Sequence, residues 1–251
     1  MLKGALLLRV WQLSAIRATR DIDLLGLTNN DTEAIEAIIR EICLIPVEDD
    51  GISFDAPSVR ATPIAEEAEY QGLRVEFGGS LGNARIPMQI DIGFGDCITP
   101  KAKEITYPTI LGMREPRLRA YPPETSIAEK FQVMLHRGVF NSRMKDYFDI
   151  WALAESRSFD GAVLAEAVRA TCERRGTAVI AVPDAFSHDT MTDPGKQSQW
   201  AAFRRRLGAT DAPDSFADVA GAVARFMSPV ADAVATRVDW AAHWNPGGPW
   251  E

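Results

Sequence analysis

Two aspartates separated by one residue offer the first chemistry in this chain. Asp21 and Asp23 flank Ile22 and are followed by Leu24 and Leu25, a pattern that predicts a short strand. Side chains at positions i and i+2 of a strand point to the same face, so both carboxylates should lie together. Two such charges repel each other unless a cation lies between them, and Mg²⁺ prefers carboxylate oxygens. The pair therefore predicts a magnesium site.

A third carboxylate follows on a predicted hairpin. Residues 72–81 and 84–94 alternate as two strands, and the pair Gly82-Asn83 between them is typical of a tight antiparallel turn. Asp91 lies between Ile90 and Ile92, so it faces the side opposite to these isoleucines. Three carboxylates suit one or two Mg²⁺ ions, and phosphoryl transfer uses such ions to neutralise a triphosphate.

The start of the chain adds a possible phosphate contact. Lys3, Gly4 and Ala5 form a small-residue turn that opens a predicted short helix over residues 4–11. The backbone N–H groups at such a helix start, together with the helix dipole, favour phosphate groups. This turn and the three acids together describe a nucleotide site.

Two predicted helices in the second half carry further charges. One begins near Pro122-Pro123, and Lys130 lies at the edge of its apolar stripe, where a lysine charge needs an anion such as a phosphate. On the next helix, over residues 142–155, the spacing of Arg143, Asp146 and Asp149 places them on one stripe. Lys130 could bind an anion such as a phosphate. The alternative is a structural role, in which an aspartate forms an ion pair with Lys130 or Arg143 that joins the two helices.

Composition limits the class of protein. The chain has 251 residues, 46% of them hydrophobic, and a net charge of −8, which argues against a dedicated nucleic-acid binder. Residues 101–145 are an exception, with nine Lys or Arg against four Glu. This stretch could hold a polyanion, and solvated surface charge is the equally good interpretation for any single residue. Arg204-Arg205-Arg206 could contact RNA, but an exposed helix face is the better interpretation.

Location follows from cysteine use and hydropathy. Three cysteines at wide spacings fit neither a disulfide framework nor a structural zinc site. We see no signal peptide and no apolar run near the ~20 residues that span a bilayer. A cytoplasmic protein without membrane contact is the expectation.

Four blocks of sequence, residues 2–9, 17–24, 88–96 and 121–149, resemble the AbiEii/AbiGii-type nucleotidyltransferase toxins of bacterial abortive-infection systems, which act in phage defence. The resemblance implies a mixed α/β (α+β) fold. A nucleotidyltransferase core like that of DNA polymerase β, with a small mixed sheet flanked by helices, is followed by a mainly helical C-terminal part. We expect the core over residues 1–120 and the helical domain over residues 121–251.

The resemblance also implies roles for individual residues. Metal would be bound by Asp21 and Asp23, with Asp91 as the third acid that orients or deprotonates the acceptor hydroxyl. The nucleotide would contact the turn formed by Lys3, Gly4 and Ala5. The helical part would contribute Lys130 and Asp146, with Lys130 also contacting the nucleotide and Asp149 as a second acid.

The first hypothesis is a Mg²⁺-dependent enzyme that moves a nucleoside monophosphate from an NTP to a hydroxyl group. The acceptor would be a tRNA 3′ end or a protein, and the toxin would be opposed by an antitoxin, the product of a neighbouring repressor gene. Relatives usually have Gly-Ser or Gly-Gly where Ala5 follows Gly4 here, and a helical stretch before this turn. These departures favour a second hypothesis, a catalytically silent module that binds nucleotide or a partner. A metal-dependent phosphohydrolase is the third.

Overall fold

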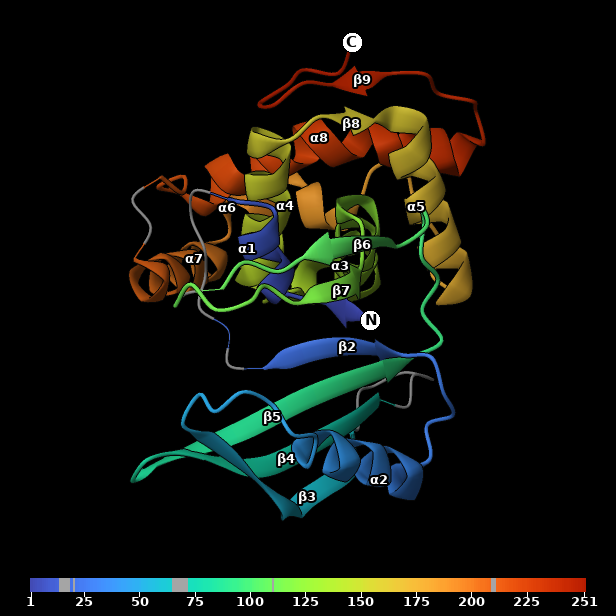
Figure 1. Ribbon diagram of the computed structural model, residues 1–251. Coiled ribbons are helices and arrows are strands. Elements are labelled where there is room, and N and C mark those ends of the chain that lie inside the picture. Colours follow the sequence, from blue (N-terminus) through green and yellow to red (C-terminus); the bar gives the residue numbers. More distant parts are fainter. Residues whose placement is uncertain (14–18, 20, 65–71, 110, 209–210) are drawn as a thin grey trace. The chain divides into compact units, whose positions relative to one another are not determined.

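The computed structural model describes residues 1–13, 19, 21–64, 72–109, 111–208 and 211–251 (Figure 1). It divides into two compact units, one formed by Met1–Leu7 and Thr19–Asp96 and the other by Leu8–Ala18 and Cys97–Glu251. Of the block over residues 17–24, Arg17, Ala18 and Arg20 lie outside the described residues. The assignment of residues 1–120 to a catalytic core stays a prediction.

The first unit is built on a mixed sheet, as the predicted fold class requires. Its strands lie in the order β3-β4-β5-β2-β1. The strands are β1 (Leu2–Lys3), β2 (Ile22–Gly26), β3 (Ile52–Ile64), β4 (Gly72–Leu81) and β5 (Ala84–Phe94). Strand β2 runs parallel to β5 and antiparallel to β1, while β4 and β5 form the predicted hairpin around Gly82-Asn83 (Figure 1).

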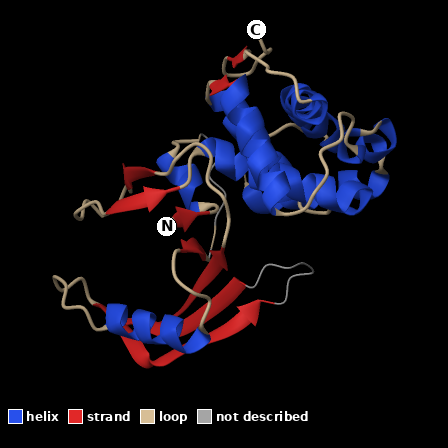
Figure 2. Ribbon diagram, turned by 90° about the vertical axis from the view of Figure 1, so that its right-hand side faces the viewer, coloured by secondary structure: helices blue, strands red, loops and turns tan. Residues whose placement is uncertain are grey.

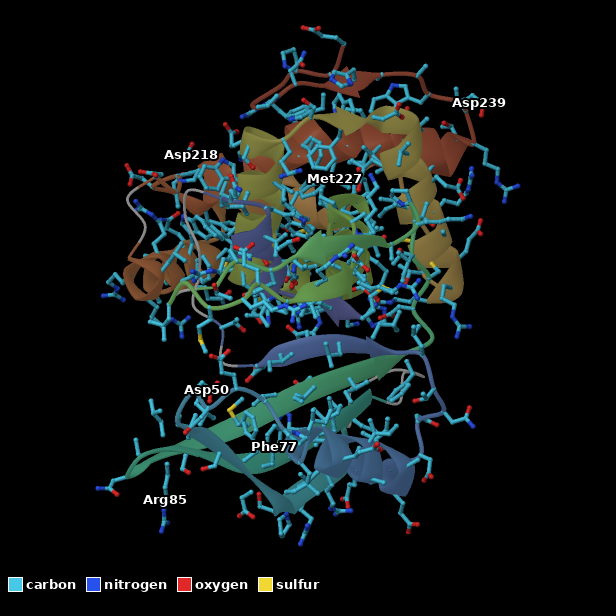
Figure 3. The ribbon with its side chains drawn as sticks, viewed as in Figure 1. Asp50, Phe77, Arg85, Asp218, Met227 and Asp239 are labelled. Carbon is cyan, nitrogen blue, oxygen red and sulfur yellow. The ribbon has the colours of Figure 1, made fainter. Side chains whose placement is uncertain are left out.

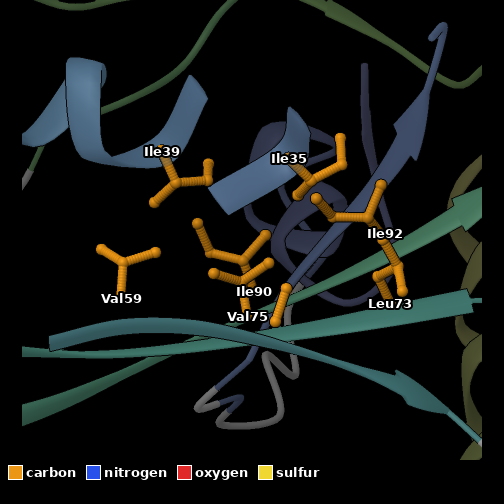
Figure 4. Packing of buried hydrophobic residues seen from close by; sticks show 8 residues of the cluster. Ile35, Ile39, Val59, Leu73, Val75, Ile90 and Ile92 are labelled. Carbon is orange, nitrogen blue, oxygen red and sulfur yellow. The ribbon is translucent and has the colours of Figure 1, made fainter. Parts of the chain in front are cut away.

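One helix covers one face of this sheet. Helix α2 (Thr32–Cys43) begins at the N-cap Asp31, whose carboxylate accepts a hydrogen bond from the Ala34 amide. Ile35 and Ile39 are buried against strand residues that include Val75 and Ile90 (Figure 4). Burying each such side chain stabilises the fold by about 1.5–3 kcal/mol. This contact therefore determines which sheet face is covered by α2, and polar residues remain on the opposite face.

The second unit is mainly helical, as the blue ribbons of Figure 2 show. Its helices are α3 (Pro123–Arg137), α4 (Met144–Ser156), α5 (Gly161–Arg174), α6 (His188–Thr192), α7 (Pro194–Leu207) and α8 (Phe216–Thr236). It also has the short helices η1 (Gly138–Phe140) and η2 (Asp184–Phe186), and antiparallel strand pairs formed by β6 (Lys103–Thr106) with β7 (Arg117–Ala120) and by β8 (Phe159–Asp160) with β9 (His243–Trp244).

Helix α8 is the hydrophobic centre of the second unit. Phe226 and Met227 have no exposed surface, and Met227 lies among the helices in Figure 3. Trp250, near the C-terminus, stacks on Phe226 with ring centroids 5.5 Å apart and donates its indole N–H to the Phe226 carbonyl. The last residues of the chain thus pack on the helical core.

The short helix α1 (Leu6–Val10) follows the turn at Gly4, within the helix predicted over residues 4–11. Among the helices in the described part of the chain, none is long and apolar enough to cross a membrane.

Candidate active site

Asp23 lies on the face of β2 that the helix α2 does not cover. Its neighbours Ile22 and Leu24 pack against the buried cluster under α2, so the alternation of the strand turns Asp23 to the other side. Opposite Asp23 in the antiparallel register is Lys3 of β1.

The turn at Gly4 approaches Asp23 so closely that only glycine fits. Gly4 has φ +75°, and a Cβ built on it would lie 2.0 Å from the Asp23 Oδ2 atom. Any side chain at this position would displace the carboxylate, so the glycine brings the turn's backbone directly against an acidic group. The adjacent Ala5 is buried, and its methyl group takes part in packing.

The third acid is the direct neighbour of Asp23 on the sheet. In the parallel register of β2 and β5, Asp23 is the partner of Asp91. Residues in register on adjacent strands point to the same face, so these two carboxylates share the uncovered side of the sheet. Asp21 immediately precedes β2, two residues before Asp23.

Both oxygens of Asp91 are engaged by an arginine that sequence reasoning missed. Arg74 of β4 donates from Nε to Asp91 Oδ1 at 2.9 Å and from Nη2 to Asp91 Oδ2 at 2.8 Å. Gln89 adds a hydrogen bond to Oδ1 at 3.2 Å. The hydrogen bonding to Asp91 raises the pKa of Arg74 further above its usual range, and the charge of Asp21 adds to this effect. Arg74 thus neutralises part of the acidic group.

The donor chemistry of Asp21 and Asp23 fits a hard divalent cation, because carboxylate oxygens are the ligands that Mg²⁺ prefers. Asp91 is held by Arg74 instead. Among the described residues, no three His, Cys, Asp or Glu side chains are grouped as a metal site. The assignment of all three acids as metal ligands stays a prediction.

Lys3 forms an ion pair with Asp96, an acid for which the sequence predicted no role. Its Nζ atom lies 2.6 Å from Asp96 Oδ2, and the Asp96 side chain is only 3% exposed. A Cβ on Gly93 would lie 3.0 Å from the same Nζ atom, so Gly93 leaves room for the lysine. The predicted contact of Lys3 with a nucleotide stays a prediction.

The helical unit holds a separate buried ionic cluster. Lys130 of α3 lies 3.0 Å from Asp149 Oδ2 and 3.8 Å from Asp146 Oδ1, while Arg143 donates from Nε to Asp146 Oδ2 at 2.6 Å. Both aspartates have no exposed surface. The predicted ion pair between the two helices is therefore present. A catalytic role for Lys130 and Asp146 stays a prediction.

Polar groups around this cluster are also removed from water. The Asp146 Oδ1 atom is buried without a hydrogen-bond partner. Lys196 is buried and donates from Nζ to the Asn141 carbonyl at 2.5 Å, and burial lowers its pKa. Burial also raises the pKa of Tyr147 to about 12. Charges in such surroundings interact more strongly than at the surface.

Comparison with known proteins gives one family. The model of the family described as "Nucleotidyl transferase AbiEii toxin, Type IV TA system" matches residues 1–225. No curated protein matches the chain.

Two solved structures from Helicobacter pylori match the chain. One, described as that of a candidate nucleotidyltransferase, has a TM-score of 0.46 and 16% identity over 95% of this chain and 87% of its own. The other is JHP933, with a TM-score of 0.41 and 14% identity over 93% of this chain and 89% of its own.

Proposed function

Because this chain belongs to the AbiEii nucleotidyltransferase toxin family of type IV toxin–antitoxin systems, we propose that it transfers a nucleoside monophosphate from an NTP to a hydroxyl group, with Mg²⁺ as cofactor. The observation that carries the proposal is the register of Asp23 with Asp91, beside a glycine turn that admits no side chain.

Each acid has a role in this reaction. Asp21 and Asp23 would hold Mg²⁺, which when bound supplies positive charge that neutralises the triphosphate. The oxygen of the acceptor hydroxyl forms a bond to the α-phosphorus, and Asp91 accepts the proton that this hydroxyl loses. The bond from the α-phosphorus to the bridging oxygen breaks, and pyrophosphate leaves.

The remaining predicted residues bind and position. The backbone of Gly4 and Ala5 at the start of α1 contacts the phosphates of the nucleotide, and Lys3 contributes charge there. Arg74 holds Asp91 in its orientation through two parallel hydrogen bonds. Lys130 offers a cationic group to a phosphate, and Asp146 keeps that group in place.

The acceptor in this proposal is a tRNA 3′ end or, as the alternative, a protein hydroxyl. The family description makes the chain a toxin with an antitoxin partner, which we expect to be a repressor encoded next to it. A cytoplasmic site of action agrees with NTP as substrate.

A second candidate function is that of a silent module that binds nucleotide without transfer. The specific observation in its favour is the engagement of both Asp91 oxygens by Arg74, which leaves the acid neutralised. Under this function, nucleotide binding would occur and no product would form.

Transfer of label separates the candidates. Purified protein is incubated with each α-phosphate-labelled NTP, Mg²⁺ and total RNA, and the measurement is repeated with Asp23→Asn. The matched control is Asp50→Asn, which removes the charge of an exposed aspartate that accepts a backbone hydrogen bond from Ile52.

Label in RNA or protein that disappears in Asp23→Asn and persists in Asp50→Asn supports transfer. Nucleotide binding without any labelled acceptor supports the silent module. Free labelled nucleoside monophosphate without an acceptor product would identify a phosphohydrolase.

A further inference from the structure

A pocket of about 720 Å³ lies in the helical unit, between the start of α4 and the C-terminal half of α7. Cationic side chains from both helices line it, namely Arg143, Lys145 and Arg206. No aspartate or glutamate is among the lining residues. A volume of this size falls in the range of ligand sites, about 300–1,000 Å³.

The charge of this pocket contrasts with that of the whole chain. The protein carries a net charge of −8, so three cationic groups around one pocket are a local feature. Arg206 is exposed and can reach a ligand, whereas its neighbour Arg204 forms an ion pair with Asp214 at 2.7 Å. Arginine binds phosphate oxygens through two parallel hydrogen bonds, so the ligand that fits this charge is a phosphate ester.

The pocket also has an apolar and aromatic wall. Phe203 is half-buried and stacks on Trp200 with ring centroids 5.4 Å apart, and its centroid lies 5.7 Å from that of Phe148. Its position is therefore fixed by packing rather than by a ligand. A wall of this kind accepts the face of a nucleobase, and Gln199 offers an amide that can both donate and accept hydrogen bonds.

One lining residue connects the pocket with the buried ionic cluster. Arg143 lines the pocket and donates from Nε to Asp146, one of the residues that we assign to the reaction. A phosphate that binds Arg143 would therefore lie next to that cluster.

We propose that this pocket binds single-stranded RNA, with phosphates on its cationic groups and a base against Phe203. The claim that this RNA is the acceptor rests on the proposed function. The claim that the pocket binds RNA rests only on the residues that line it. An acidic protein segment would also meet the cations, but its carboxylates would make no use of the aromatic wall, so RNA is the favoured occupant.

Binding of a fluorescent single-stranded RNA oligonucleotide to the full chain tests the proposal. Fluorescence anisotropy is measured without NTP and without Mg²⁺, so the result does not depend on transfer. The test variant is Arg206→Glu, and the matched control is Arg205→Glu, which makes the same change in net charge at the preceding, exposed residue of α7 that does not line the pocket.

We expect Arg206→Glu to weaken RNA binding about tenfold or more, because a charge-assisted contact becomes a repulsion. The slope of log affinity against log salt should also become less steep by about one. Arg205→Glu should weaken binding by no more than about twofold at moderate salt. Circular dichroism of both variants checks that the fold is unchanged.

Several results would overturn the proposal. Absence of RNA binding by the wild-type chain is one such result. An equal loss of affinity in both variants is another, because it would indicate a diffuse electrostatic attraction. Displacement of the RNA by an equally charged polyglutamate peptide at the same concentration would identify an acidic protein as the occupant. If the wild-type chain binds RNA but transfers no label, the result counts against the proposed function and not against the RNA-binding pocket.

Discussion

Arg74 binds both carboxylate oxygens of Asp91 across the β4–β5 hairpin, at 2.9 and 2.8 Å. The two residues are direct partners in the antiparallel register. The acid that we expect to accept a proton is thereby held in one orientation by a planar, permanently charged group. The same pair lowers the negative charge that a triphosphate would meet.

Arg74→Gln should lower the rate of label transfer about tenfold or more, because Asp91 would retain only the contact from Gln89. The free energy of unfolding should change by less than about 1 kcal/mol, since this ion pair is partly solvent-exposed. Transfer assays and urea unfolding measure the two quantities. Arg85→Gln is the control, because Arg85 lies near the turn of the same hairpin and projects into solvent (Figure 3). Equal rates in both variants would count against a positioning role for Arg74.

Gly4→Ala should lower transfer about a hundredfold, because the new Cβ would lie 2.0 Å from the Asp23 carboxylate and would move it. Gly82→Ala is a matched control. Gly82 also has positive φ, but a Cβ there has nothing within 4 Å, so the strain is present without the displacement. Transfer rates of the two variants, compared at equal folded fraction, decide the matter. A similar loss in both would mean that backbone strain, and not the position of Asp23, controls the rate.

Lys130→Met should lower the free energy of unfolding by about 3–5 kcal/mol, because the buried Asp149 would lose the cation that lies 3.0 Å from its Oδ2 atom. The double variant Lys130→Met with Asp149→Asn should recover part of this loss, since both charges are then absent. Urea unfolding measures both. Lys103→Met, at an exposed site, should stay within about 0.5 kcal/mol of the wild type.

Label transfer by the same double variant separates structure from function. If Lys130 contacts the nucleotide, transfer stays low although stability returns. Full recovery of both the free energy of unfolding and the rate of label transfer would mean that Lys130 has only a structural role, the ion pair between α3 and α4.

Alkaline pH should destabilise the protein partly through Cys172. Burial raises the pKa of this thiol from 9.0 to about 12. Below pH 9 both the folded and the unfolded chain keep the proton, so the contribution is complete there. As the pH rises toward 12, only the unfolded chain loses the proton, and stability falls by about 1.4 kcal/mol per pH unit.

Urea unfolding at about pH 8 and about pH 10.5 checks this, with Cys172→Ala as the variant. The wild type should lose more stability between the two conditions than the variant. An identical loss in both proteins would show that the thiol keeps its proton in both states or loses it in both.

The hairpin was the most predictable part of the site. Gly82-Asn83 is a two-residue turn, and Leu81 pairs with Ala84 across it. Counting back from this turn also places Arg74 opposite Asp91, so the arginine could have been found from the sequence. Helical spacing placed Asp146 and Asp149 on one stripe and left open whether Lys130 or Arg143 pairs with them; in the structure Lys130 pairs with Asp149.

Other features were not accessible to pattern reasoning. Strand β1 has two residues, too few for any periodicity, and its pairing with β2 depends on contacts far along the chain. The bond from Lys3 to Asp96 depends on the same distant contacts. Helix α2 shows a limit of another kind. The spacing of its isoleucines predicts one apolar stripe of Ile35, Ile38, Ile39 and Ile42, but Ile38 and Ile42 are exposed, because the sheet covers only a narrow side of the helix.

Strand β2 has hydrogen-bond partners on both of its edges, β1 on one side and β5 on the other. The segment that contains β2 leaves the ribosome long before β5 is synthesised, so during translation one edge of β2 stays open. Asp23 and Asp91 become neighbours only when the hairpin has formed and docked, a long-range step that is slow compared with helix formation. A nascent or truncated chain that ends before β5 therefore lacks the pair of acids, so the proposed transfer would require the complete first unit.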